Sequence, residues 1–442
     1  MKIYNLLLAF SFFSSLSYLH LQAAPPQTQI DVYAKEVFKA PIALSYFSVS
    51  TEKNQKETEN LNRQLYDILR QDLDFTNYFI FIPPESFLED PRKMANINYS
   101  LWRQLKIKYL ITGALKIGET IDISIKVVSI DQEKTIYQES KSSSKDGLRT
   151  VMHQFSNEIY EKLTGDKGIF LTKIAFISNH SGFKELYTMD YDGNNIEQLT
   201  RLKNIVMLPS WAPSGNKILF SSYATRNKRK NLDLFEIDTT TKQIRTLSKR
   251  EGLNMGATYS PDGHTIALTL SINSYPNIYF MKPDSSGLHL AAASPESDFS
   301  PTFSPDGKKI LFVSTRSGNP HLFIKDISQS VREAQRLTYA GKYNAAPQWS
   351  KSANKIVFAG QLESHFDLFS IDPKGFVIER LTKSLDNGHN EHPSWSPNGR
   401  HIVFYSTRSN KSDIYIITAN GSLEKRITHD FGKCLTPAWG PL

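Results

Sequence analysis

The chain of 442 residues is 40% apolar and 12% aromatic, a composition that excludes an intrinsically disordered protein and allows one large core or two separate cores. Its 52 basic and 44 acidic residues give a net charge of +8, which is modest for this length and argues against a nucleic-acid-binding protein. Cys434 is the only cysteine in the sequence, so no internal disulfide can form.

Residues 1–24 differ in composition from everything that follows. Lys2 precedes a largely apolar run over residues 3–21, and Ala23 and Ala24 precede two prolines. This pattern is typical of a secretory signal peptide and predicts export. The residues before the expected cleavage site match the usual pattern poorly, so an uncleaved anchor remains the alternative.

The next segment, residues 25–39, is polar and is predicted to be extended. Residues 41–49 then have the composition of a strand, and residues 59–73 place leucine and isoleucine at helical spacing, which predicts a helix with one buried face. A second strand is expected over residues 78–82, because Pro83 and Pro84 stop it.

The following segments complete a small α/β domain, which we place at residues 40–165. A short helix is expected over residues 99–105, and a hairpin joins the β-rich runs 109–116 and 120–130. Another strand is expected over residues 135–140. Residues 146–163 again have helical periodicity, and Gly165 provides the stop.

From residue 168 to residue 442 the helical period disappears and a repeat begins. Each copy has an aromatic anchor, a turn such as Ser304-Pro305-Asp306-Gly307, and a second strand that is apolar on both faces. The anchors recur every 44 to 48 residues, the period of a β-propeller blade. They are Trp211, Tyr259, Phe303, Trp349, Trp395 and Trp439.

The two ends of the repeat region complement each other. The first copy lacks an anchor strand before Ile174, whereas Pro437–Trp439 supplies an anchor strand with nothing after it. Joining them makes one composite blade and closes a ring of six. The predicted fold class is therefore α+β multidomain: a small N-terminal α/β domain followed by a six-bladed β-propeller closed by the C-terminal strand.

No familiar catalytic signature is present in the sequence. There is no nucleophile elbow, zinc-protease helix, phosphate loop or dinucleotide fingerprint, so we expect neither an enzyme nor a cofactor. His389, Glu391 and His392 could hold a metal, but a solvated loop is the favoured interpretation. The basic run 226–230 fits a solvated loop tip better than a site for an anionic partner.

One column of residues suggests a binding surface. Five residues before each anchor, four of the six copies carry Asn or Asp, in loops that ring closure gathers at one mouth of the channel. Local turns explain these residues without a function, and a partner-binding rim is the sharper alternative. The column is Val206, Asn254, Asp298, Asn344, Asn390 and Cys434.

Several motifs together resemble the TolB family. They are Ala40-Pro41-Ile42-Ala43, the junction Leu163-Thr164-Gly165, the strand Lys173-Ile174-Ala175-Phe176 and the Ser-Pro-Asp-Gly repeats. The chain also departs from the family pattern: Asn157 replaces an aspartate, residues 350–353 lack the Pro-Asp-Gly turn, and Leu253 stands near Asn254 where the family has a histidine.

The resemblance implies a non-enzymatic periplasmic adaptor of the Tol-Pal system, which maintains the outer membrane and supports its constriction at cell division. It implies that the propeller mouth binds the lipoprotein Pal and that the N-terminal segment binds TolA or folds back against the protein. The expected mouth residues are Asn254, Asp298, Asn344, Asn390, Glu391 and His392. The expected residues of the N-terminal segment are Gln27, Thr28, Gln29, Ile30, Asp31, Val32 and Tyr33.

The protein is further expected to be a monomer, peripheral to the envelope membranes, without a metal and without a nucleic-acid partner. Two alternatives remain open at this point. One is an exported propeller that binds a small ligand or acts as a hydrolase in its channel. The other is a purely structural envelope protein.

Overall fold

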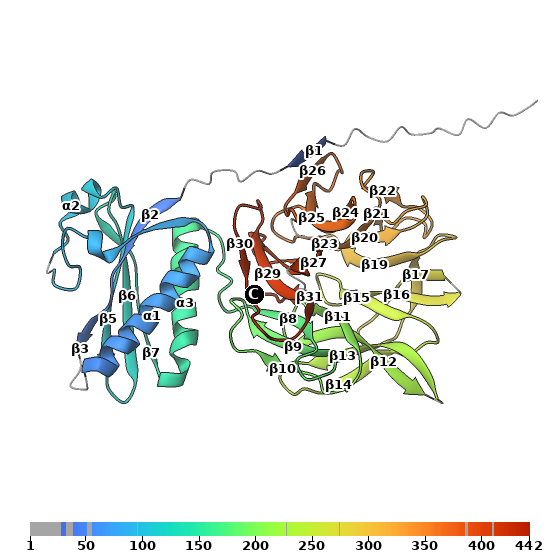
Figure 1. The fold of residues 1–442 in the computed structure, drawn as a ribbon, viewed down its shortest axis with the longest axis horizontal. Coiled ribbons are helices and arrows are strands. Elements are labelled where there is room, and N and C mark those ends of the chain that lie inside the picture. The colour runs from blue at the N-terminus through green and yellow to red at the C-terminus, as the bar shows by residue number, and fades with distance from the viewer. Residues whose placement is uncertain are drawn as a thin grey trace, which may run out of the picture.

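The structure is a computed structural model that describes residues 28–31, 39–50, 55–94, 96–226, 228–273, 275–384, 388–408 and 411–442. The chain forms an N-terminal α/β domain beside a β-propeller (Figure 1). The predicted signal peptide, residues 1–24, lies outside the described residues, as do Gln27, Val32 and Tyr33. Within the described part of the chain, no helix is long and apolar enough to cross a membrane.

The N-terminal domain is a mixed sheet with the strand order β4-β2-β5-β6-β7, and β3 pairs with β5. Its strands are β2 (Ala40–Leu44), β3 (Ser48–Ser50), β4 (Phe79–Ile82), β5 (Tyr109–Ile117), β6 (Ile121–Ser129) and β7 (Lys134–Ser143). Its helices are α1 (Gln55–Phe75), α2 (Tyr99–Gln104) and α3 (Leu148–Thr164), with single 3-10 turns η1 (Pro84–Ser86) and η2 (Lys145–Gly147).

The single strand expected over residues 41–49 is wrong, because the structure has two strands there. Both β2 and β3 run parallel to β5, with a break at residues 45–47. The Asn62 side chain of α1 accepts from Phe47 N at 3.0 Å and donates to Phe47 O at 2.7 Å. A side chain therefore takes the place of the sheet ladder at Phe47.

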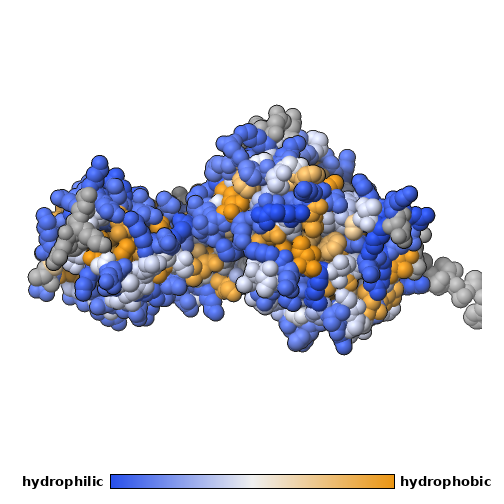
Figure 2. Space-filling model, turned by 90° about the horizontal axis from the view of Figure 1, so that it is seen from below, coloured by the Kyte–Doolittle hydropathy of each residue, from blue (hydrophilic) through white to orange (hydrophobic). Residues whose placement is uncertain are grey.

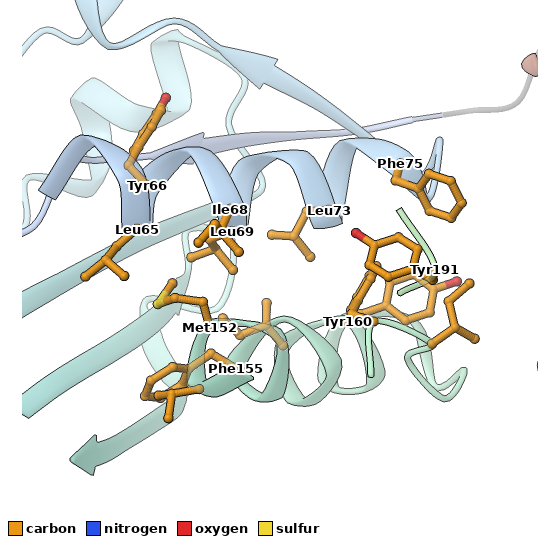
Figure 3. Close-up of a cluster of buried hydrophobic side chains, with 14 of the residues drawn as sticks. Leu65, Tyr66, Ile68, Leu69, Leu73, Phe75, Met152, Phe155, Tyr160 and Tyr191 are labelled. Carbon is orange, nitrogen blue, oxygen red and sulfur yellow. The ribbon is translucent and has the colours of Figure 1, made fainter. Parts of the chain in front are cut away.

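Helices α1 and α3 lie against each other and bury their apolar stripes (Figure 3). Leu65, Leu69 and Leu73 of α1 meet Met152 and Phe155 of α3, and all five side chains are fully buried. Helix α3 ends at Gly165, whose φ of 80° closes the last turn through a bond from its N–H to Glu161 O.

The propeller has six sheets of four strands, and a fifth strand joins one of them. The innermost strands are β11 (Val206–Trp211), β15 (Asn254–Tyr259), β19 (Asp298–Phe303), β23 (Asn344–Trp349), β27 (Asn390–Trp395) and β31 (Cys434–Trp439). The second strands are β12 (Lys217–Arg226), β16 (Ile266–Asn273), β20 (Lys309–Ser314), β24 (Ile356–Leu362), β28 (His401–Ser406) and β8 (Lys173–Ser178).

The third and fourth strands lie progressively further from the channel. The third strands are β13 (Arg229–Asp238), β17 (Tyr275–Met281), β21 (His321–Asp326), β25 (His365–Ile371), β29 (Asp413–Thr418) and β9 (Glu185–Asp190). The outermost strands are β14 (Ile244–Ser248), β18 (His289–Ala292), β22 (Gln335–Arg336), β26 (Val377–Arg380), β30 (Glu424–Arg426) and β10 (Glu197–Gln198).

The composite blade predicted from the sequence is present, so the six-bladed closed ring is confirmed. Strand β31 pairs antiparallel with β8, with Cys434 opposite Ser178 and Trp439 opposite Ile174. The sheet order is β10-β9-β8-β31, which joins two segments from opposite ends of the repeat region. After closure, each of the six innermost strands is paired with the second strand of its blade.

A β-bulge interrupts every innermost strand at its third residue. Each of these six residues has a left-handed backbone, with φ between 42° and 59°. Only one of them is a glycine, so the conformation comes from the repeat and not from the side chain. They are Leu208, Gly256, Ser300, Ala346, His392 and Thr436.

The N-terminal segment adds the fifth strand to one blade. Strand β1 (Thr28–Asp31) runs parallel to β26, with Thr28 opposite Val377 and Asp31 opposite Arg380. It covers the outer edge of the sheet β23-β24-β25-β26. The part of this segment that the structure describes is thus folded back along the propeller.

Candidate functional site

The candidate site is the channel end at which the six innermost strands begin, which we call the mouth. The second strands end there and the third strands begin there, so each hairpin between them also projects at the mouth. Side-chain contacts between the N-terminal region and the propeller fall at the opposite end, for example Asn77 with Ser422 and Arg400 with Asp166. The N-terminal domain therefore leaves the mouth uncovered.

The four polar side chains predicted for the rim of the mouth are buried. Asn254 and Asp298 are each 0% exposed, Asn344 is 2% exposed and Asn390 is 1% exposed. Each begins an innermost strand, and its side chain bonds to residues of the preceding blade, so these four side chains join neighbouring blades. Direct contact with a partner through these four side chains would need the loops above them to open.

Asn390 shows what this column does. Its amide donates to Asp367 Oδ1 at 2.9 Å, and its carbonyl accepts from Arg408 Nη2 at 2.9 Å. Asp367 also accepts from Thr382 Oγ1 and from Arg380, so loops from four strands meet at one buried group. Buried polar groups that are fully bonded fix one loop arrangement.

At the equivalent position of its blade, Asp298 has a carboxylate in place of the asparagine amide. Arg316 Nη2 lies 2.9 Å from its Oδ2, and Ser294 Oγ donates to Oδ1 at 3.2 Å. Burial raises the pKa of Asp298, while Arg316 opposes the shift. The Arg316 guanidinium also lies over the Phe312 and Phe323 rings, which holds the arginine in place.

Asn344 and Asn254 also hold loops together through buried hydrogen bonds, with different partners. We call the bonded side chains of Asn254, Asp298, Asn344 and Asn390 the latches. Asn344 Nδ2 lies 3.0 Å from His321 Nδ1 and 3.1 Å from Thr338 Oγ1. Burial lowers the pKa of His321 to about 4, so this histidine is neutral at neutral pH. Asn254 accepts from Ser248 Oγ at 2.6 Å and donates to Leu232 O at 2.9 Å.

The other two predicted mouth residues differ from the column. Glu391 is half-buried and accepts a short hydrogen bond from the Tyr405 hydroxyl. His392 has a left-handed backbone, and its Nδ1 has no partner within the described part of the chain. Burial lowers the pKa of His392. Together with His389 they form no metal site, since the described residues hold no cluster of three potential ligands.

A cavity of about 250 Å³ occupies the channel below the mouth. It runs from the bulge residues to the turns after the aromatic anchors, and of the six predicted mouth residues only His392 lines it. Three polar atoms in its wall lack partners among the described residues: Trp349 Nε1, His392 Nδ1 and Thr436 Oγ1. The cavity can therefore hold a small polar molecule or ordered water.

A second polar cluster, which was not predicted from the sequence, lies at the junction of the two domains. Asp72 of α1 is 1% exposed, its Oδ2 lies 2.7 Å from His153 Nδ1 of α3, and its Oδ1 accepts from the Tyr191 hydroxyl at 2.5 Å. Burial, with Asp72 beside it, raises the pKa of Tyr191. Asp72 is a carboxylate among the buried residues of α1, and this is the signal in the sequence that could have indicated the cluster.

Aromatic rings surround this cluster. Tyr191, from the loop after β9, lies beside Phe75 at the end of α1 (Figure 3), with ring centroids 5.1 Å apart. His401 of β28 stacks on the other side of Phe75 at 4.5 Å, and its Nε2 lies 3.2 Å from Phe75 O. Burial lowers the pKa of His401 to about 4.

Comparisons with known proteins agree with this architecture. The TolB amino-terminal domain matches residues 28–136, and the TolB beta propeller domain matches residues 160–442. A solved structure of TolB from Acinetobacter baumannii has a TM-score of 0.79 and 23% identity, covering 93% of this chain and 99% of its own. At that identity the likeness shows the fold.

Curated relatives carry the same family name. A protein named Protein TolB homolog from Chlorobium luteolum is 33% identical over 263 residues, 59% of each chain. A Tol-Pal system protein TolB from Desulfosudis oleivorans is 34% identical over 250 residues, 55% of each chain. The chain thus aligns with between half and two thirds of the length of these relatives. Because the propeller domain of the family matches more than half of the chain, this protein belongs to the TolB family.

Proposed function

We propose that this protein is a non-enzymatic adaptor of the Tol-Pal system, which binds a Pal-like lipoprotein at the propeller mouth and a TolA-like protein through its N-terminal segment. In this role it supports outer-membrane integrity and constriction at cell division. The observation that carries the proposal is a closed TolB propeller whose mouth is rigidly latched and left uncovered by the N-terminal domain.

The rigid mouth supports recognition of a folded partner. The latches at Asn390, Asp298, Asn344 and Asn254 fix the loops around them, so these loops lose little entropy when a partner binds. The partner would touch exposed residues of the mouth loops, such as Lys342 near Asn344 and Lys433 beside Cys434, instead of the latch side chains.

The N-terminal segment supports a second binding mode. Strand β1 is held by only four parallel pairs on the edge of β26. A partner can take over such a short strand by offering an edge of its own, as in β-strand addition. The edge of β26 would then be released.

A periplasmic location accords with the signal-like residues 1–24 and with the family. An absence of catalysis accords with the mouth, where the polar side chains are engaged in bonds between neighbouring blades. The protein acts in this proposal through the partners it holds.

A pull-down with paired variants tests the mouth. Lys342→Glu with Lys433→Glu reverses two exposed charges in mouth loops, and we expect at least a tenfold loss in capture of a Pal-like lipoprotein from envelope extract. The control, Lys308→Glu with Lys374→Glu, makes the same charge change in exposed turns at the opposite end and should bind as the unmodified protein does. Equal capture by both variants would place the Pal site elsewhere.

Deletion of residues 27–33 tests the N-terminal segment. We expect capture of a TolA-like protein to disappear while capture of the Pal-like lipoprotein and the melting temperature stay the same, because β1 is a short edge strand. Retained TolA capture would refute this part of the proposal.

The small-ligand alternative has one observation in its favour, the cavity with three unpartnered polar atoms. Native mass spectrometry of the protein purified from the periplasm would reveal a retained small molecule. If the measured mass equals that of the polypeptide alone, in a preparation that still captures the Pal-like lipoprotein, the cavity holds only water.

A further inference from the structure

The hairpin between β12 and β13 has more strand pairs than the corresponding hairpin of any other described blade. Ser222 of β12 pairs with Asp233 of β13, at the level where β8 and β20 end in Ser178 and Ser314. Beyond it come four more pairs, from Tyr223 opposite Leu232 to Arg226 opposite Arg229. Four additional pairs extend the hairpin by roughly 13 Å past the mouth.

Two neighbouring loops brace the hairpin on either side. Asn204 Nδ2 donates to Tyr223 O at 2.6 Å, and Asn231 Nδ2 donates to Arg250 O at 2.8 Å. Residues 201–205, 223–226, 228–232 and 249–253 therefore form one continuous surface, which we call the basic ridge. It lies at the end of the propeller far from the N-terminal domain (Figure 1).

The basic ridge holds most of the chain's excess charge. It contains eight basic residues and one acidic residue, a net charge of +7, whereas the whole chain has +8. The basic residues are Arg201, Lys203, Arg226, Lys228, Arg229, Lys230, Lys249 and Arg250, and the acidic residue is Glu251.

The fold gains little from these charges. Arg226 pairs with the buried Asp233, but Arg229 and Glu251 are 3.9 Å apart with side chains 86% and 94% exposed. Within the described part of the chain, no carboxylate pairs with Lys228 or Lys230. Arg226 lies directly opposite Arg229, and like charges in that position destabilise a hairpin.

Apolar side chains stand among the charges. Leu202 is 39% exposed, Ile205 is 42% exposed and Tyr223 is 36% exposed. Figure 2 shows strongly hydrophilic residues beside apolar ones on the surface at this end of the propeller. Long basic side chains around exposed aliphatic and aromatic groups suit the boundary between lipid headgroups and acyl chains.

We propose that the basic ridge docks the protein on a membrane surface through anionic phospholipid headgroups. The ridge projects outward, so its cations can reach a flat layer of phosphates together, and the apolar groups can enter the headgroup region. An acidic protein segment is less suited, because the exposed cations of the ridge stand among exposed apolar side chains, which a purely acidic segment would leave unused. The inference is independent of the proposed Pal and TolA partners.

Vesicle cosedimentation tests the ridge, using residues 25–442 so that the apolar residues 1–24 cannot enter the bilayer. We expect binding to phosphatidylcholine vesicles that contain phosphatidylglycerol, little binding to pure phosphatidylcholine, and release by salt. Replacing Lys228, Arg229 and Lys230 with glutamine should weaken binding about 100-fold, since each cation near an anionic surface contributes roughly fivefold.

A matched control removes three charges elsewhere. Lys282, Lys308 and Lys374 are exposed in turns at the opposite end, and their replacement with glutamine should leave vesicle binding unchanged. Tyr223→Ser with Leu202→Ser should weaken binding without altering its salt dependence. Melting temperatures identify any variant that fails to fold, and the salt release of the unmodified protein provides a second measurement that needs no variant.

Three results would overturn the proposal. The first is an unmodified protein that does not bind the phosphatidylglycerol vesicles at low salt. The second is a control variant that loses as much binding as the ridge variant. The third is release from vesicles by soluble polyglutamate at equal charge concentration, which would assign the ridge to an acidic polypeptide.

Discussion

The mouth of the propeller and the junction between the domains are both held by buried polar groups, but they are built differently. At the mouth, related latches recur in several blades, with Asn390 and Asn344 in equivalent positions. At the junction a single cluster, Asp72 with His153 and Tyr191, joins α1, α3 and the propeller. A repeated arrangement divides its contribution to stability among many loops, whereas the unique cluster makes its contribution at one place.

The largest effect should come from the unique cluster. Asp72→Ala leaves a buried histidine and a buried tyrosine without their shared partner, and we expect a loss of about 3 to 5 kcal/mol in the free energy of unfolding. Asp74→Ala, two residues along α1 and exposed, should change stability by less than about 0.5 kcal/mol. Urea denaturation measures both, and similar midpoints for the two variants would show that the cluster is dispensable.

Acidification should weaken both regions to a similar extent. The pKa of His401 at the junction and that of His321 at the mouth are lowered to about 4, so the folded state favours their neutral forms. Their stabilisation is complete above pH 6.5 and is lost as the pH falls toward 4. Each should cost about 2 kcal/mol at pH 5.

Single replacements separate the two contributions to this pH dependence. His321→Asn and His401→Asn should each reduce the stability difference between pH 7.5 and pH 5 by about 2 kcal/mol, measured by urea denaturation, and the buried His392 contributes to what remains. If either variant kept the full pH dependence, the other acid-sensitive groups of the fold would have to account for it.

A single latch should matter less than the junction cluster. Asn390→Ala leaves Asp367 and Arg408 each short of one bond, and we expect a loss of about 1 to 3 kcal/mol. Asn194→Ala, in an exposed turn, is the matched control. A loss as large as that of Asp72→Ala would mean that the latches act as one cooperative unit.

The smallest effect concerns Cys434, which occupies the latch position in the composite blade. It is 0% exposed, and burial raises the pKa of its thiol to about 11. We expect slow reaction with a thiol reagent at pH 8 in the folded protein and fast reaction in urea. The neutral thiol stabilises the fold below pH 9, and this contribution is lost as the pH rises toward 11. Fast labelling of the folded protein would show that the composite blade opens.

The repeated parts of this molecule could be predicted from the sequence, because the aromatic anchor occurs six times and most copies also carry the turn that follows it. Counting Trp211 and its equivalents was enough to find the ring and its closure. The direction in which a side chain points was harder to predict than the repeat. Asn254 and its equivalents were placed at the right end of the propeller, but their burial depends on partners such as Asp367, which the spacing does not reveal.

Unique features had no relatives to compare. The contact between Asp72 and Tyr191 joins residues 119 positions apart, and neither belongs to a pattern. The break between β2 and β3 depends on Asn62, a polar residue of α1 that reaches across to Phe47. In both cases one side-chain contact decides the local structure, and periodicity carries no information about it.

Ring closure also sets the order in which this chain can fold. Ser178 Oγ of β8 donates to Phe431 O beside β31, across 253 residues of sequence. Contacts so distant form late, because the intervening chain must first be ordered. Before they form, β8 and β31 each present an unpaired edge. We therefore expect closure of the composite blade to be the slow step in folding of the propeller, and the chain to be most prone to aggregation before that step.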